Sequence, residues 1–225
     1  MKRLLLLTLG LTMICGAKAQ EEKLEIKPSG RILLDGGLFK ADGQDDKFND
    51  GFAIPDMRVG FSASYGAWKA KVDMGYAYGK VNMKDVFVQY NFDKEAADFL
   101  RAGYFIHQFG LQSATSSSFK ISMEEPASNQ AFNNSRMIGL MYQHTRSKFL
   151  GTLSFFTESD AMKMTSDKLG NQGVGMMTRL VYKPFCEPGK IFHVGLSGAF
   201  ETPRYSSDKE LSHHSYTLST TFPTR

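Results

Sequence analysis

Apolar and polar residues alternate strictly along the chain from Met57 to Tyr65 and again from Trp68 to Tyr78. The polar set of this stretch includes Arg58, Ser62, Lys69, Lys71 and Asp73. A period of two predicts β-strands that carry one apolar and one polar face. Because only Gly66 and Ala67 separate the two segments, we expect a hairpin.

The same pattern recurs along the rest of the chain and predicts about ten strands in all. The other segments are Gly30–Phe39, Asp85–Phe92, Phe99–Phe105, Met137–His144, Phe149–Thr157, Gly173–Tyr182, Ile191–Glu201 and Ser215–Phe222. Only Lys94–Phe99 resembles a helical turn. Long loops alternate with short turns, apart from a short link at Gly79–Asn82, which gathers most long loops at one end of the sheet. This arrangement is typical of outer-membrane barrels.

The fold class we predict is therefore all-β, an antiparallel transmembrane β-barrel. In such a barrel the apolar face of each strand meets lipid and the polar face lines a lumen. Aromatic residues gather toward segment ends, as in the girdles of these barrels. The alternative is a secreted β-sandwich, in which the apolar face would form the core.

The first residues predict export. Lys2-Arg3 is a charged region, Leu4–Ile14 an apolar region and Ala17-Lys18-Ala19 a cleavage site, so residues 1–19 form a signal peptide and residues 20–225 the barrel domain. Without Lys2, Arg3 and Lys18 the formal charge falls from +4 to +1. A nucleic-acid partner is not expected. No later apolar run reaches the roughly 18 residues of a membrane helix, so strands must contact the outer-membrane lipid.

One cysteine, Cys186, remains in the mature chain, in the turn expected over Pro184–Gly189. An intramolecular disulfide is therefore impossible.

The segment Leu100–Tyr142 resembles the phosphate-selective porin O/P family. Its motifs fall on Gly103, Phe105, Phe109-Gly110, Ser116–Ser118, Glu124-Glu125, Phe132, Arg136 and Gly139. The stretches "DVFVQYNF" and "TRLVYKP" resemble the family as well. The resemblance implies a sixteen-stranded barrel in the cell outer membrane and a homotrimer. Because about ten strands are predicted here and the chain ends "TTFPTR", we expect the barrel domain to be incomplete at its C-terminus.

Basic residues predominate slightly on the predicted lumen face. The cations are Arg31, Arg58, Lys69, Lys71, Arg101 and Arg179, and the carboxylates are Asp35, Asp56, Asp73 and Asp85. Lysines and arginines facing a pore attract anions. The alternative is ordinary lumen charge, balanced from strand to strand. We therefore expect a porin for small, preferably anionic solutes such as phosphate.

The loop Ile106–Ser135 is long enough to fold into the lumen. In the resembled family the equivalent loop narrows the pore, which would place Lys120 there. Arg136 is ambiguous, because simple alternation puts it on the face of Ile138, whereas a bulge could turn it inward.

No catalytic residue, metal site or cofactor is predicted. An outer-membrane protease or lipase would need a nucleophile close to a histidine, and no such pattern accompanies His107, His144, His193, His213 or His214. The adjacent pair His213-His214 would point to opposite sides of a strand. We therefore expect a channel and not an enzyme.

Overall fold

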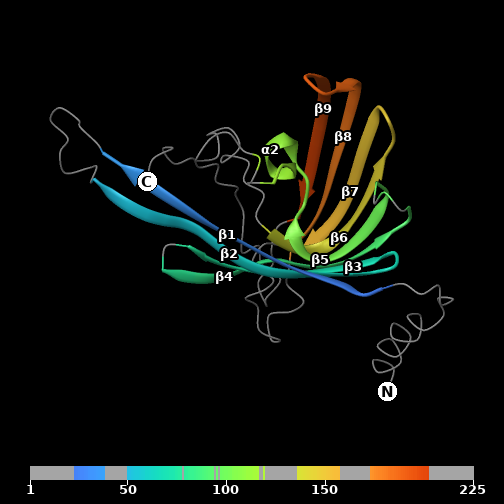
Figure 1. Ribbon diagram of the computed structural model, residues 1–225. Coiled ribbons are helices and arrows are strands. Elements are labelled where there is room, and N and C mark those ends of the chain that lie inside the picture. Colours follow the sequence, from blue (N-terminus) through green and yellow to red (C-terminus); the bar gives the residue numbers. More distant parts are fainter. Residues whose placement is uncertain are drawn as a thin grey trace, which may run out of the picture.

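A computed structural model describes residues 23–38, 50–77, 79–93, 95, 97–116, 119, 136–157 and 173–202. Its strands are β1 (Glu25–Gly37), β2 (Gly51–Tyr65), β3 (Trp68–Ala77), β4 (Lys80–Asn91), β5 (Phe99–Ile106), β6 (Arg136–Thr145), β7 (Phe149–Thr157), β8 (Val174–Glu187) and β9 (Lys190–Glu201). Each strand pairs antiparallel with the next, so the nine form one sheet in the order β1 to β9. Figure 1 shows this sheet as a curved wall.

Nine of the predicted strands are confirmed in type and order. The tenth, Ser215–Phe222, and the signal peptide lie outside the described residues. Several strands are longer than alternation predicted, because ladder pairing continues through polar ends. β2 begins at Gly51, paired with Gly37, and β8 continues to Glu187, paired with Lys190. We had expected Cys186 in a turn, but it lies on a strand, opposite Ile191.

A short helix, α2 (Gly110–Ala114), follows β5. The sequence did not predict it, because five residues are too few to display a helical period. Of the region that resembled a helical turn, the structure describes Glu95, which lies in a turn, and residues 97–99, of which Phe99 begins β5.

The connections divide the sheet into two different ends. Residues 66–67, 92–98, 146–148 and 188–189 form the connections at one end, which we call the short-turn end. Residues 38–50, 78–79, 107–135 and 158–173 connect strands at the other, the loop end. The predicted alternation of loop lengths is thus confirmed, including the short link after β3.

The register separates the sheet into two faces, because direct cross-strand partners project to the same side. One row joins Lys69, Gln89, Arg101, Met141 and Ser154. We call this side the inner face. The adjacent row joins Trp68, Tyr90, Leu100, Tyr142 and Leu153, and we call that side the outer face.

Two apolar clusters lie on the inner face. The first contains Phe87, Phe99, Phe105 and Met141. The second contains Met137, Phe156 and Met177, packed against Phe109 from the segment that follows β5. Apolar side chains are buried on this otherwise polar face because the chain folds back over it after β5.

The outer face is apolar and exposed over all nine strands. Val72 is 45% and Leu196 is 73% exposed, and the described strands form a single sheet that no second sheet covers. A two-sheet sandwich is therefore not found in the part of the chain that the structure describes. A continuous apolar surface of this kind requires an apolar environment or a partner.

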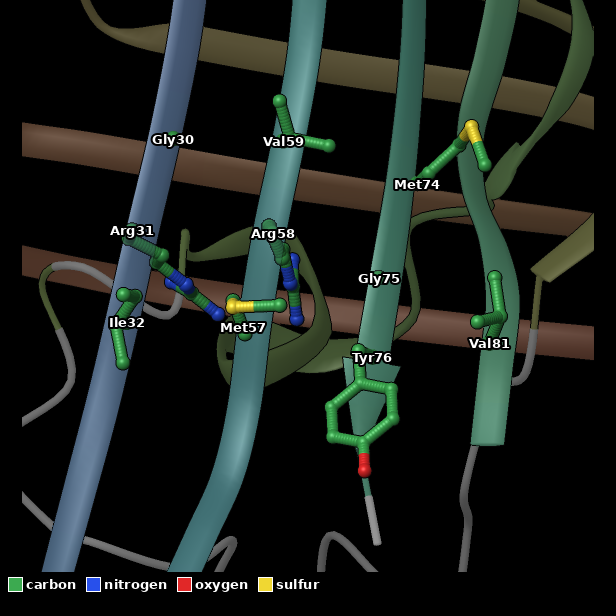
Figure 2. A pocket seen from close by; sticks show the side chains of 10 residues that line it. All are labelled: Gly30, Arg31, Ile32, Met57, Arg58, Val59, Met74, Gly75, Tyr76 and Val81. Atoms are coloured by element: carbon green, nitrogen blue, oxygen red, sulfur yellow. The ribbon is translucent and has the colours of Figure 1, made fainter. Parts of the chain in front are cut away.

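An apolar groove of about 620 Å³ crosses β1 to β4 on the outer face. Figure 2 shows Ile32, Met57, Tyr76 and Val81 in one row across these four strands. Gly30 lies in the neighbouring row, opposite Val59, and its missing side chain leaves room above the sheet. Within the described ranges, no helix is long and apolar enough to cross a membrane.

Candidate functional site

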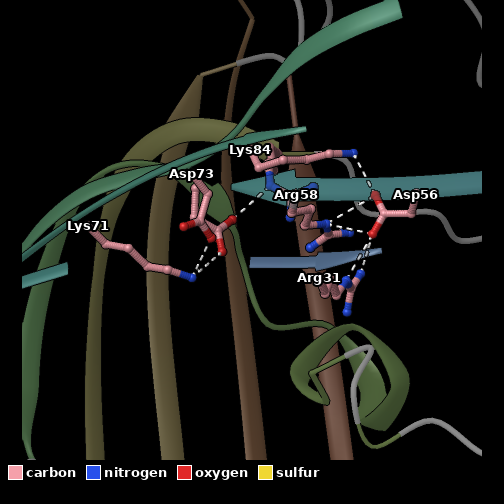
Figure 3. Close-up of polar contacts among 8 residues, drawn as sticks. Arg31, Asp56, Arg58, Lys71, Asp73 and Lys84 are labelled. Carbon is pink, nitrogen blue, oxygen red and sulfur yellow. Dashed lines mark hydrogen bonds and ion pairs between the residues drawn. The ribbon is translucent and has the colours of Figure 1, made fainter. Parts of the chain in front are cut away.

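Asp56 on β2 lies at the centre of a group of cations on the inner face (Figure 3). The Arg31 guanidinium donates to its Oδ2 from Nε at 3.0 Å and from Nη2 at 2.5 Å. Arg58 Nε lies 2.8 Å from the same oxygen, and Lys84 Nζ lies 3.7 Å from Oδ1. Three cations around one carboxylate leave an excess of positive charge.

A second group adjoins the first and completes what we call the charged network. Lys71 Nζ lies 2.5 Å from Asp73 Oδ2 and 3.7 Å from Asp85 Oδ2. Arg136 Nε donates to Asp85 Oδ1 at 2.7 Å. The network therefore consists of Arg31, Asp56, Arg58, Lys71, Asp73, Lys84, Asp85 and Arg136, and its cations outnumber its carboxylates.

The contact with Asp85 settles the orientation of Arg136. It is the first residue of β6, paired with Ile106 in a regular ladder. Its side chain nevertheless reaches the inner-face carboxylate. The strand end gives the side chain this freedom, and no bulge is present in the β5–β6 ladder.

A β-bulge brings Lys84 into the network. Val72 opposes Val86 and Met74 opposes Met83, so Lys84 and Asp85 together lie opposite Asp73. A bulge breaks strict alternation at the extra residue. Sequence reasoning placed only Asp85 on this face and missed Lys84. The available signal was that the outer-face residues Met83 and Val86 are separated by two residues instead of one.

Gly60 makes room for the Asp73 carboxylate. A Cβ atom at Gly60 would lie 1.9 Å from Asp73 Oδ1 and 2.9 Å from the Val72 carbonyl oxygen. Asp73 is buried as a result, although Lys71 reaches its other oxygen. A glycine is required at this position for the carboxylate to pack against the sheet.

Arg101 on β5 is held by uncharged groups. Its guanidinium lies over the ring of Phe87 at 4.1 Å from the centroid, and at 4.8 Å and 5.4 Å from those of Phe99 and Phe105. Its Nε and Nη2 donate to Gln89 Oε1 at 2.9 and 2.7 Å. A cation over an aromatic face is attracted by the ring quadrupole.

Lys69 and Arg179 complete the cations predicted for the strands. Lys69 lies opposite Gln89, and Arg179 lies on β8 between Thr152 and Ser197. Neither has a carboxylate within ion-pair distance among the residues that the structure describes.

The register thus puts six of the predicted residues on the inner face: Arg31, Arg58, Lys69, Lys71, Arg101 and Arg179. Lys120 lies outside the described residues. A pore-lining role for these residues stays a prediction.

The segment after β5 lies against the inner face of β6 to β9. His107 is completely buried, with Nε2 3.2 Å from the Met137 carbonyl oxygen and its ring between those of Phe105 and Phe156. The Gly110 N–H donates to Ser197 Oγ on β9 at 3.0 Å, and α2 lies beside β9 in Figure 1. The described part of the long loop therefore folds over the sheet and not away from it.

At the short-turn end, Asp98 connects two neighbouring turns. Its Oδ1 accepts from the Thr145 N–H at 2.8 Å, and its Oδ2 lies 3.0 Å from His144 Nδ1 and 3.2 Å from Arg146 Nη1. The Thr145 N–H, assisted by the Arg146 guanidinium and by the contact with His144, holds the pKa of Asp98 below its usual value.

Aromatic rings form a band on the outer face near the short-turn end. Trp68 and Tyr90 are in edge contact at 5.0 Å, Tyr90 and Phe92 at 5.3 Å, and Phe92 and Tyr142 at 6.0 Å between centroids. Bands of amphipathic rings mark the membrane–water interface of outer-membrane barrels.

The described residues contain no group of three metal-ligating side chains. Comparison with known proteins matched residues 26–224 to the model of a protein family, phosphate-selective porin O and P. The chain belongs to this family of outer-membrane porins, which confirms the resemblance seen in the sequence and indicates a channel instead of an enzyme. No curated protein and no solved structure matched.

Proposed function

We propose that this protein forms a water-filled channel in the outer membrane that conducts small anionic solutes such as phosphate. The observation that carries the proposal is the excess of cations on the inner face. The charged network alone holds five cations against three carboxylates, counted from the residues named above. Lys69, Arg101 and Arg179 add charge without a carboxylate partner in the described ranges.

The network also fixes its charges in place. Ion pairs with Asp56, Asp73 and Asp85 orient the basic groups toward one face, while the surplus charge remains to act on a passing solute. Fixed charges beside low-dielectric walls raise the local concentration of counter-ions, and salt screens this effect over about 8–10 Å. An anion is therefore concentrated along β1 to β5 more strongly than a cation.

The proposed location in the membrane follows from the outer face of the sheet. The exposed apolar surface of the sheet would meet lipid hydrocarbon, with the aromatic band around Trp68 and Tyr90 at one interface. Backbone groups at an open sheet edge in lipid are costly, so the sheet belongs to a closed barrel. By resemblance to the family we further propose sixteen strands, a homotrimer and a role for Lys120 in narrowing the pore.

Efflux from reconstituted vesicles tests this function. We expect phosphate to leave vesicles faster than a cation of similar size such as tetramethylammonium. Lys84→Met removes one network charge and keeps most of the side-chain volume. A charge about 6 Å from the path in a water-like dielectric changes the anion energy by about 0.7 kcal/mol, which predicts about threefold slower phosphate efflux.

Lys148→Met is the matched control. Lys148 is exposed in the turn between β6 and β7, away from the inner face, so its loss should leave the efflux rate unchanged. Equal efflux of phosphate and tetramethylammonium through the wild-type protein would contradict the proposal.

A further inference from the structure

Arg101 differs from the network cations in the chemistry of its partner. Arg31, Arg58, Lys71, Lys84 and Arg136 each contact an aspartate carboxylate. Arg101 instead makes a two-point contact with the amide oxygen of Gln89. No carboxylate lies within ion-pair distance of its guanidinium in the described part of the chain.

In this contact a neutral amide takes the place that a carboxylate has in the ion pairs of the network. Nε and Nη2 of Arg101 both donate to one oxygen, as the same atoms of Arg31 do to Asp56 Oδ2, but here that oxygen belongs to a neutral amide. The amide nitrogen of Gln89 donates in turn to Asn91 Oδ1 at 2.6 Å, which fixes which end of the amide faces Arg101.

Three phenylalanine rings complete the surroundings of the Arg101 guanidinium. They surround the guanidinium at 4.1 to 5.4 Å and restrict its motion without neutralising it. Lys69, the partner of Gln89 on β3, adds a second cation to the same row. Asp85 is the nearest carboxylate along β4, and it is already engaged by Arg136 and Lys71.

We propose that Gln89 is a specificity-determining residue of the channel: it positions Arg101 while leaving its full positive charge to act on the permeating ion. This inference rests on the proposed function and adds one residue to it. A carboxylate at position 89 would make the same two hydrogen bonds but would cancel the charge. With Lys69 and Arg101 in the same row, glutamine at position 89 leaves two positive charges there, whereas glutamate would leave a net charge of one.

The experiment is the reversal potential of the reconstituted full-length protein in a potassium chloride gradient. Gln89→Glu replaces the side-chain amide by a carboxylate and preserves the shape of the side chain. We expect its chloride-to-potassium permeability ratio to fall about two- to fivefold, because the field acts on both ions with opposite sign.

The matched control is Ser147→Asp, which adds the same charge in the exposed turn between β6 and β7. This position lies outside the strands whose inner face the ion would pass, so its effect should be much smaller. Arg101→Gln removes the charge directly and should reproduce the fall seen with Gln89→Glu. Heat-modifiable migration in detergent verifies that each variant is folded.

The inference is overturned if folded Gln89→Glu keeps the wild-type ratio, or shifts it no more than Ser147→Asp does. If Gln89→Glu does not fold, an unchanged ratio in Arg101→Gln overturns it instead. A wild-type protein that conducts without anion preference overturns the proposed anion selectivity itself, and this inference with it.

Discussion

A lysine in the middle of the outer face should destabilise the protein far more than a lysine near the edge of the same face. Val72 on β3 and Val81 on β4 are both exposed valines of the outer face. We compare Val72→Lys with Val81→Lys. Both variants replace a valine by a lysine on the outer face, so they differ in the depth of the lysine in the membrane.

The register gives the two depths. Val72 follows Trp68 of the aromatic band by four residues, about 13 Å along the strand at about 3.3 Å per residue, or about 10 Å in depth at a tilt of about 40°. This lies near the middle of an apolar band about 25 Å tall. Val81 pairs with Tyr76, which is eight residues from Trp68 and therefore about 20 Å from the band in depth.

The expected costs follow from these depths. A lysine near the midplane of a barrel costs about 2–4 kcal/mol and one near an interface about 0–1 kcal/mol. Denaturant unfolding in lipid vesicles measures both, with fluorescence of Trp68, the chain's single tryptophan, as the probe. Equal costs for the two variants, or a cost below about 0.5 kcal/mol for Val72→Lys, would refute the assignment of the outer face to lipid.

Two further outcomes are expected. Gly139→Ala should lower the free energy of unfolding by about 1–3 kcal/mol, because a Cβ would lie 2.3 Å from the Phe155 carbonyl oxygen and 2.7 Å from His107; Gly195→Ala, with no neighbour closer than 3.7 Å, should be nearly neutral in the same unfolding assay. The pKa of Asp98 is lowered in the folded state. Its carboxylate therefore stabilises the fold fully above the unfolded-state pKa of about 3.9, and this stabilisation is lost as pH falls through the folded-state pKa. Between pH 6 and pH 2 the free energy of unfolding should therefore fall less in Asp98→Asn than in the wild type. Equal decreases would contradict the stabilising role of this carboxylate.

The sequence was sufficient to predict the strands and their faces. A period of two is a direct consequence of β geometry, and one face of each strand here is consistently apolar. Six of the predicted cations therefore share a face in the structure. The family motifs between Leu100 and Tyr142 added the class of protein, which periodicity alone could not supply.

What alternation could not predict are the departures from it. Lys84 entered the network through a bulge in the β3–β4 ladder, and Arg136 through the freedom of a strand end. Ion-pair partners also depend on which strands are neighbours and in which register, information that no single strand contains. The partner of Arg101 could not be read from the sequence, because Gln89 becomes its neighbour only through the pairing of β4 with β5.

α2 and the burial of His107 could not be predicted either. Both depend on the long connection after β5 folding back over β6 to β9, which is decided by tertiary contacts such as the hydrogen bond between Gly110 and Ser197. The ring of His107 is enclosed between those of Phe105 and Phe156.

We propose that the cationic inner face lines an anion-preferring channel. The most direct test is a planar-bilayer recording of the wild-type protein across a potassium chloride gradient, at low and at high salt. We expect discrete conductance steps and a reversal potential displaced toward the equilibrium potential of chloride. This preference for anions should weaken as salt screens the fixed charges. Absence of conductance, or a reversal potential on the potassium side, would contradict it.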